Sequence, residues 1–374
     1  MLERAAARRA AALARVRAVA DRVGAPGVVL TKPSSVAWAG ADINPPIDRT
    51  AAVDTVWLAV SATDCTIITT HVELPRIVAE LAPSDLRVIA VDWFDPNAFV
   101  EAAADVLAAS PYGLASDGHP DFGVDVSDDL IAIRLDLSEA EQLDLADLAI
   151  DSTHAVESAL RHWSPGETDF EIAARIAGDV EAVGADAPVL LVGGDDRLAN
   201  FRHPVANGSR PQQTVMAVLV ARRKGLHVAL TRYVSTGQSS DAERALEVTQ
   251  RIHGAVLDSV TNHTTFGNVM TALGDAYAAA GHPGEWRNHY QGGPIGFGQR
   301  EFEIAPGQTT SRWWNEPVRP GVAVAFNPSL PGGAKDEDTY LVGANGELRW
   351  LTSSGHWPTT HVAGHARPSV LVHN

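Results

Sequence analysis

Two strand-like runs near the C-terminal end of the chain decide how its fold is interpreted: PGVAVAFNPSL at Pro320–Leu330 and DEDTYLV at Asp336–Val342. Both contain short apolar segments rich in β-branched or aromatic residues, and a third such run, ELRWLT, follows at Glu347–Thr352. Gly and Pro residues punctuate the sequence between them. The segment from Gly281 to Asn374 is therefore predicted to consist mainly of strands.

The sequence before this segment predicts two helices, then strands, then two further helices. Ser138 followed by Glu141 has the form of a capping box, which begins a long amphipathic helix extending to about Trp163. The next elements are a helix from Thr168 or Asp169 to about Val183, strands in APVLLVGG, TVMAVLVARR and LHVALTRYV, and helices over about Ser240–Thr261 and Phe266–Ala280. This succession is typical of an α+β domain rather than of a doubly wound sheet.

The first part of the chain has a different pattern. Over Pro26–Leu135, β-like runs such as TVWLAVSAT, CTIITT and LRVIAVDWF are interspersed with helical segments such as Ala98–Ser110, which predicts a smaller α/β domain with a mixed sheet. The segment Pro111–Asp129, rich in Gly, Asp and Pro, is predicted to be a loop or a short hairpin near a domain boundary. We therefore expect two domains, residues 1–135 and 136–374.

Composition excludes several classes of protein. The 374 residues carry a formal net charge of −17, which disfavours binding to nucleic acid or to anionic lipid surfaces. Cys65 is the only cysteine, so the chain has no internal disulfide and no thiolate metal cluster, and a reducing cytoplasm is the expected location. No segment reaches the roughly 18 uncharged apolar residues of a membrane span. Neither nucleotide-binding glycine motif, GxGxxG nor GxxxxGK[ST], is present in the required context.

Several motifs in the second part resemble those of the pita-bread superfamily of methionine aminopeptidases, Xaa-Pro peptidases and creatinase. In chain order they are GGDDRLANFRHP (Gly193–Pro204), GLHVALTR (Gly225–Arg232), HYQGGPIGF (His289–Phe297), PGVAVAFNPSL and DEDTYLV. SSVAWAG and HVELPRIVAE, nearer the N-terminus, also resemble the creatinase-type N-terminal domain. The resemblance implies a small creatinase-type N-terminal α/β domain followed by a pita-bread domain.

The resemblance also marks five positions at which peptidases of this superfamily hold two divalent metal ions. The matching residues here are Val218, Ala229, Gly293 (or, at best, Pro294), Asn327 and Glu337. Only Glu337 supplies a carboxylate, whereas a dinuclear site needs several anionic oxygens to bridge its ions. We therefore expect neither a catalytic metal nor another cofactor.

Creatinase shows that this fold also hydrolyses a C–N bond without metal, with a histidine as proton shuttle. The matching residue is His203, and imidazole both takes and gives a proton near neutral pH. Glu337 is the second catalytic candidate, because a carboxylate can hold a cationic substrate nitrogen or fix a histidine tautomer. Its neighbour Asp338 is expected instead to bind Arg232 and brace two strands.

Other polar residues are candidates for binding a small polar substrate in the same cavity. Asn327 replaces a carboxylate by an amide that both donates and accepts hydrogen bonds. His227 shares a strand face with Ala229, because side chains alternate along a strand. The remaining candidates are His289, Gln291, Arg232, Arg300 and Glu301.

Three functions remain open at this level. The first is a metal-independent hydrolase-like enzyme that cleaves an amide or amidine C–N bond of a small polar substrate, with lyase chemistry as a neighbour. The second is a non-catalytic descendant that binds a ligand or a protein. The third is a metal-dependent Xaa-Pro-type peptidase whose ligands are misaligned. The resemblance further implies a homodimer.

Overall fold

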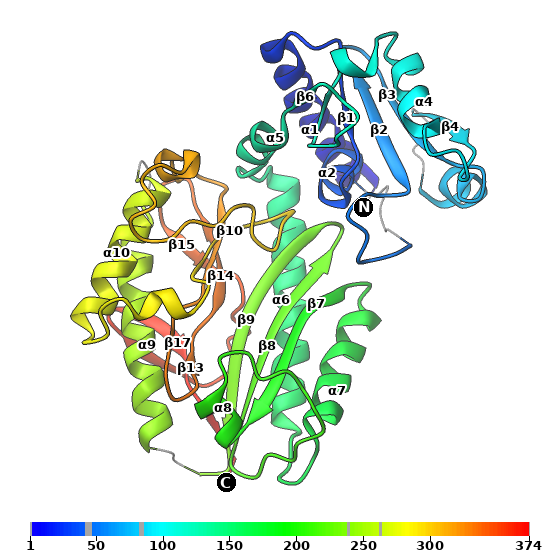
Figure 1. Ribbon diagram of the computed structural model, residues 1–374. Coiled ribbons are helices and arrows are strands. Elements are labelled where there is room, and N and C mark those ends of the chain that lie inside the picture. Colours follow the sequence, from blue (N-terminus) through cyan, green and yellow to red (C-terminus); the bar gives the residue numbers. More distant parts are fainter. Residues whose placement is uncertain (1, 42–46, 82–85, 238–239, 262–263, 374) are drawn as a thin grey trace. The chain divides into compact units, whose positions relative to one another are not determined.

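The computed structural model describes residues 2–41, 47–81, 86–237, 240–261 and 264–373. The chain forms two compact units, Met1–Arg134 and Leu135–Asn374. Each unit has its own sheet and its own apolar core, so each is described by itself (Figure 1).

The first unit is built on a six-stranded mixed sheet with the order β4-β3-β2-β1-β5-β6. Pairs β1–β2 and β2–β3 are antiparallel, and the other neighbours are parallel. Its elements are α1 (Leu2–Val23), β1 (Gly27–Leu30), α2 (Pro33–Gly40), β2 (Val56–Ser61), β3 (Cys65–Thr70), α3 (Leu74–Arg76), η1 (Ile77–Leu81), β4 (Arg87–Val91), α4 (Ala98–Val106), η2 (Pro111–Gly113), β5 (Ala115–Ser116), β6 (Val124–Asp125) and α5 (Ser127–Arg134).

Side chains of this sheet and of α4 make the core of the first unit. Trp57, Ile68 and Leu107 are buried in it, and Trp57 lies 4.8 Å from the ring of Phe99. The prediction of a mixed α/β sheet is confirmed. The segment Pro111–Asp129, predicted to be a loop or a short hairpin, instead contains β5 and β6, which pair in parallel and extend the sheet at its edge.

The second unit begins with two helices whose N-termini are fixed by capping boxes. Ser138 caps α6 together with Glu141, as the sequence predicts, and Thr168 caps α7 together with Glu171. The elements are α6 (Glu139–Arg161), α7 (Asp169–Ala182), β7 (Asp186–Gly194), α8 (Asp196–Asn200), β8 (Thr214–Arg223), β9 (Leu226–Ser235), α9 (Ser240–Ser259), α10 (Phe266–Ala279), η3 (Glu285–Asn288), β10 (Gly292–Ile295), η4 (Arg312–Asn315), β11 (Ala323–Phe326), β12 (Ser329–Leu330), β13 (Ala334–Lys335), β14 (Asp338–Val342), β15 (Leu348–Trp350), β16 (Thr359–Val362), β17 (His365–Pro368) and β18 (Leu371–Val372).

Two four-stranded sheets carry the second unit, with the orders β18-β9-β8-β7 and β10-β11-β14-β15. Helices α6 and α7 pack against the first sheet, and α9 and α10 pack against each other beside the second (Figure 1). The two sheets meet where the backbone N–H of Thr231 in β9 donates to the carbonyl of Glu337, 2.9 Å away. The predicted α+β arrangement is confirmed.

The segment entering β14 presents charged side chains alternately to two sides. Asp336 and Asp338 both contact the guanidinium of Arg367. Lys335 and Glu337 interact electrostatically with each other instead. This alternation follows from the period of two in extended backbone. One short stretch of chain therefore supplies both a buried ionic network and a separate group of charges.

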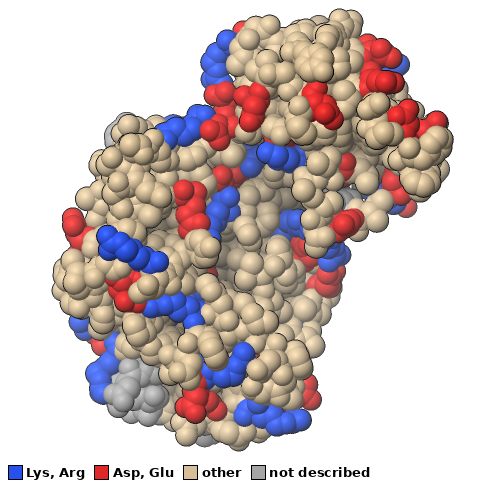
Figure 2. Space-filling view, in the orientation of Figure 1, with Lys and Arg blue, Asp and Glu red and all other residues tan. Residues whose placement is uncertain are grey.

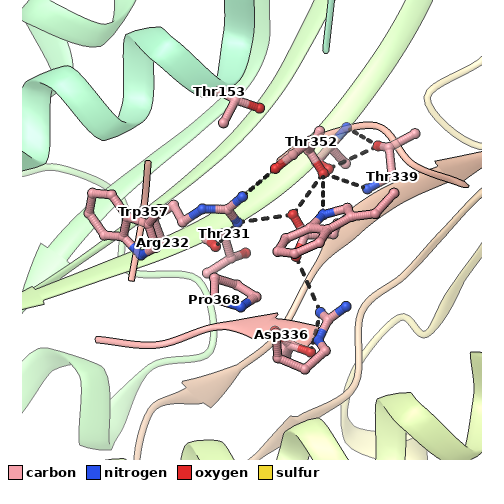
Figure 3. A network of polar contacts seen from close by, with 12 residues as sticks. Thr153, Thr231, Arg232, Asp336, Thr339, Thr352, Trp357 and Pro368 are labelled. Atoms are coloured by element: carbon pink, nitrogen blue, oxygen red, sulfur yellow. Dashed lines mark hydrogen bonds and ion pairs between the residues drawn. The ribbon is translucent and has the colours of Figure 1, made fainter. Parts of the chain in front are cut away.

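The ionic network joins β9, α6, β14 and β17 (Figure 3). Arg232 Nη1 donates to Asp338 Oδ1 at 3.0 Å, and its Nε lies 3.3 Å from Glu157 of α6. Thr352 Oγ1 also donates to Asp338 Oδ1, at 2.7 Å. Burial alone would raise the pKa of Asp336, but the Arg367 charge and the His253 hydrogen bond lower that pKa to about 2.

The surface carries both signs of charge. On the face drawn in Figure 2, Lys and Arg side chains are interspersed with Asp and Glu and do not gather into one basic patch. Within the described residues, no helix is both long and apolar enough to cross a bilayer.

Candidate functional site

Two histidines from distant parts of the chain meet in the second unit. His203 follows α8 and is exposed, whereas His289 follows η3 and is buried. Their Nε2 atoms are 3.2 Å apart, so one ring donates a hydrogen bond to the other. Partial burial and the charge of Lys335 lower the pKa of His203, and burial followed by the same charge lowers the pKa of His289 to about 2. The pair is therefore uncharged at neutral pH and extends from an exposed ring to a buried one, whose Nδ1 has no hydrogen-bond partner among the described residues.

Lys335 and Glu337 form the second part of the site. Their side chains are only 3% and 6% exposed. Burial lowers the pKa of Lys335 to about 8 against the opposing charge of Glu337. Burial raises the pKa of Glu337 to about 7, although Lys335 and Arg300 lower it. Both groups therefore titrate close to neutral pH, which is a frequent property of catalytic acids and bases.

Neither charged group is committed to a partner. Among the described residues, no hydrogen bond or ion pair is formed by the Lys335 ammonium or by the Glu337 carboxylate. Two further buried polar atoms in the same part of the structure, Thr231 Oγ1 and Asn327 Oδ1, also have no hydrogen-bond partner there. Buried polar groups are normally satisfied, so this concentration of unsatisfied atoms indicates a place for a polar ligand.

Strand pairing brings these residues together. Phe326 pairs with Asp338 in the antiparallel β11–β14 ladder. One residue beyond this pair, Asn327 lies opposite Glu337. The Thr231 amide donates to the Glu337 carbonyl. Tyr233, two residues along β9, accepts a hydrogen bond from the Lys335 amide at 2.9 Å. Strand register places Asn327 beside Glu337, and hydrogen bonds to Thr231 and Tyr233 of β9 hold Glu337 and Lys335 in place.

Lys335 also lines a cavity of about 190 Å³. Apolar side chains, including those of Leu198, Phe201 and Met216, make much of its wall. Arg202 lines the same cavity and donates to Ser329 Oγ at 2.6 Å. The cavity therefore combines an apolar surface with two cationic side chains.

Arg300 belongs to this electrostatic environment, as the sequence predicts for a site residue. Its charge lowers the pKa of His203, Lys335 and Glu337. Its guanidinium lies 5.0 Å from the ring centroid of the exposed Tyr290. Arg300 therefore adds positive charge near the Glu337 carboxyl group, which is only partly ionised at pH 7.

The side chains of three other candidates are engaged in hydrogen bonds or ion pairs within the protein. Arg232 faces the ionic network on the opposite side of β9, where Asp338, Glu157 and the Thr352 carbonyl bind it, so its assignment to substrate binding is not supported. Gln291 bonds Tyr277 and two backbone carbonyls. Glu301 accepts from the Gly298 amide. These three residues therefore support the walls and strands rather than a ligand.

His227 lies on the same face of β9 as Ala229, in keeping with the alternation of side chains along the strand. Its Nδ1 is 3.0 Å from the Gly296 carbonyl, and its amide donates to the same oxygen. The ring thus anchors the loop after β10. Asp195 accepts hydrogen bonds from three consecutive amides, Gln212 to Thr214, and so shapes the loop before β8.

Sequence reasoning missed Lys335 and Arg202. Two signals point to Lys335: it is one of only three lysines in a chain with many arginines, and it lies two residues before Glu337. The period of two in a strand places such a residue on the same side as Glu337. Arg202 directly precedes His203, but nothing in its local pattern separates it from a surface arginine.

Comparison with known proteins identifies the family. The sequence model of metallopeptidase family M24 matches residues 146–344, which is more than half of the chain. The chain belongs to metallopeptidase family M24. No curated protein matches the sequence at a significant level.

Solved structures of M24-like proteins have the same fold. Dipeptidase PepE from Mycobacterium ulcerans is 26% identical, with a TM-score of 0.73 and 98% of each chain covered. The prolidase from Pyrococcus horikoshii OT3 is 18% identical, with a TM-score of 0.72, and the alignment covers 91% of this chain and 98% of the prolidase. The N-terminal domain of FACT complex subunit SPT16 from Cicer arietinum is 12% identical, with a TM-score of 0.63 over 92% and 95% of the two chains. These likenesses confirm the pita-bread fold of the chain.

The family name implies bound metal, but the donor set at the corresponding positions does not fit it. Val218 and Ala229 supply hydrocarbon, and Glu337 is the one carboxylate. In the described ranges, no group of three His, Cys, Asp or Glu side chains is arranged to hold an ion. The charge of Lys335 acts on Glu337, where it opposes a second cation. This protein is a divergent M24 member.

The raised pKa of Glu337 predicts a pH-dependent stability effect. A carboxyl group with a folded pKa of about 7 and an ordinary value of 4.5 favours the folded state below pH 4.5, and this contribution is lost as the pH rises through 7. Glu337→Gln mimics the protonated form, so we expect it to raise the free energy of unfolding by about 1–3 kcal/mol at pH 8 and by little at pH 5.

Denaturant unfolding at the two pH values measures this effect. Asp275→Asn on the exposed face of α10 is the matched control and should change stability equally at both. A gain from Glu337→Gln that is the same at pH 5 and pH 8 would contradict the assignment.

Proposed function

We propose that this M24 member is a metal-independent hydrolase that cleaves an amide or amidine C–N bond of a small polar substrate in the cytoplasm. The observation that supports this most strongly is the His203–His289 contact next to the uncommitted Lys335 and Glu337. Together they offer proton transfer near neutral pH and fixed charge in a protected setting. Residues 1–135 are proposed as the accessory domain and residues 136–374 as the catalytic domain.

In this proposal His203 moves the proton. It takes one from an attacking water and returns it to the departing nitrogen, so that the C–N bond breaks as a C–O bond forms. His289 fixes the tautomer of His203, because only one of the two facing Nε2 atoms can carry hydrogen. Proton transfer by a positioned side chain typically contributes a factor of about 10²–10⁴ in rate.

The other residues hold the substrate. Glu337 accepts a hydrogen bond from a substrate N–H, and the Asn327 amide orients the neighbouring polar atoms. The protonated form of Lys335, with Arg300, stabilises negative charge that develops on a carbonyl oxygen. Fixed charges of this kind act without reorganisation at the moment of reaction. In an amidine substrate, Glu337 takes the larger share of the stabilisation.

A substrate panel with matched variants tests the proposal. Turnover of dipeptides, N-acyl amino acids and amidines is measured after chelation, and His203→Ala should lower kcat by about 10²-fold or more on any substrate found. His154→Ala, an exposed histidine on α6, should leave kcat unchanged. Equal turnover by His203→Ala and wild type would refute the shuttle.

A second candidate function is ligand or protein binding without catalysis. The fold likeness to the SPT16 domain favours it, because that domain is described as part of the FACT complex rather than as a peptidase. Saturable binding of panel compounds without turnover would support this alternative. Metal-dependent turnover that returns on adding zinc or manganese would instead restore an ordinary M24 peptidase.

We also propose a homodimer, by analogy with creatinase-type relatives. Light scattering checks the mass against the 39.6 kDa of one chain. A mass equal to that of one chain at working concentration would contradict the dimer.

A further inference from the structure

We propose that Lys335 is a carbonyl-reactive lysine that forms a reversible imine with a small anionic carbonyl compound, such as a 2-oxo acid, entering from the cavity beside it. This activity goes beyond the proposed hydrolysis. It uses the neutral amine of Lys335, whereas the hydrolytic proposal uses its protonated form.

Lys335 combines burial with a position beside a cavity. Lys335 is buried and is one of the residues that line the cavity of about 190 Å³, a space well above the roughly 10–15 Å³ that one water needs. In the part of the chain that the structure describes, its ammonium makes no hydrogen bond or ion pair. Burial disfavours this ammonium, and the nearby Glu337 charge compensates only in part, which favours the neutral and nucleophilic amine.

The backbone around Lys335 is held firmly. The Tyr233 hydroxyl accepts from the Lys335 amide and lies 2.9 Å from the Lys335 carbonyl and 3.0 Å from that of Gly333, to one of which it donates. Ser329 pairs with Lys335 in the β12–β13 ladder. The backbone that carries the amine is thus held by β9 and β12 rather than by a loose loop.

The use of lysine at this place is itself informative. Arginine supplies nearly all basic residues of the chain, and Lys32, Lys224 and Lys335 are the only lysines. Lys32 is exposed, and Lys224 forms an ion pair with Asp144 at 3.7 Å. Arginine would provide a buried positive charge but no nucleophilic amine. Lys335 therefore differs from the other two lysines in being buried and without an ion pair among the described residues.

The surroundings select the carbonyl compound. Arg202 lines the same cavity, and the charge of Arg300 acts on Lys335. Arg202 also pairs with Glu285 and Arg300 with Glu303, yet both positive charges still lower the pKa of Lys335. A carboxylate beside the carbonyl group of the partner would complement this positive charge. Leu198 and Met216 on the cavity wall leave room for a short apolar substituent.

The reaction balances without another reagent. The Lys335 nitrogen adds to the carbonyl carbon, giving a carbinolamine; the oxygen then leaves as water and a C=N bond remains. Both hydrogens of the amine depart with that oxygen. Glu337 gives a proton to the leaving hydroxyl group and recovers one from nitrogen, a role that suits a carboxyl group which titrates near neutral pH. Hydrolysis of the imine is the reverse path.

Reductive trapping tests the proposal on the full-length protein. Pyruvate and sodium cyanoborohydride convert an imine into a stable secondary amine, which peptide mass mapping then locates. The N-terminal amine, Lys32 and Lys224 are internal references in the same sample. We expect at least on the order of tenfold more label on Lys335 than on either other lysine.

Two variants sharpen the result. Lys335→Met should remove the main label while Lys32 and Lys224 label as before, and Glu337→Gln should slow labelling at Lys335 alone. Mapping of the wild-type protein decides the question even if Lys335→Met does not fold. Label spread evenly over the lysines, or absent from Lys335, would overturn the proposal. Because no hydrolysis is measured, failure here and failure of the proposed hydrolase are separate outcomes.

Discussion

Replacing Asp338 by asparagine is expected to lower the free energy of unfolding by about 3–5 kcal/mol. The Asp338 carboxylate is fully buried between the guanidinium groups of Arg232 and Arg367, and Thr352 donates a further hydrogen bond to it. Asparagine keeps the shape but loses the charge. Two buried cations would then share less compensation, and one of them would face an amide N–H₂ group.

Denaturant unfolding measures this loss, with hydrogen exchange in α6 and β9 assigning the transition to the second unit. Glu247→Gln is the matched control, because the Arg251–Glu247 pair on α9 is more than half exposed on both sides. Exposed pairs of this kind contribute about 0–1 kcal/mol. If Asp338→Asn and Glu247→Gln shifted the midpoint equally, the network would not be a major support of the fold.

Gly292→Ala is expected to cost about 3 kcal/mol or more. Gly292 has φ +80°, and an added Cβ would lie 2.1 Å from the Ala325 carbonyl oxygen of the neighbouring strand. Backbone atoms of β11 cannot move aside without breaking the β10–β11 ladder. The glycine is therefore required by the close approach of two strands.

The control for Gly292→Ala is Gly281→Ala. Gly281 has φ +85°, but an added Cβ there meets nothing within 4 Å. This variant isolates the cost of the left-handed backbone, about 1–2 kcal/mol. The difference between the two variants in thermal or denaturant unfolding then measures the clash alone. Equal losses would show that β11 yields to the added methyl group.

The fold was largely predictable because its signals are local and repeated. The capping box at Ser138, the helical periods after it and the ordered motifs from Gly193 to Val342 each indicate the same arrangement. The parallel pairing of β5 and β6 was not predictable in this way. Two-residue strands leave almost no period in the sequence, and their pairing depends on contacts with β1.

The site was predictable only in part. Motif position led to His203 and Glu337, but the meeting of His203 with His289 depends on tertiary structure. Lys335 was missed because lysine is ordinarily a surface residue, and only burial reveals its setting. Arg232 was misplaced although the strand period contains the answer: it is an odd number of residues from His227 and so faces the other side of β9.

The charged residues that alternate before β14 form two groups, one at the proposed site and one in the network that supports the fold. Lys335 and Glu337 belong to the proposed site, whereas Asp336 and Asp338 hold the sheets and helices together from the other side. A lineage that lost its metal ligands could thus keep a folded protein throughout, because the supports of the fold were never among those ligands. The same separation lets a protein engineer redesign the cavity face while leaving the ionic face untouched.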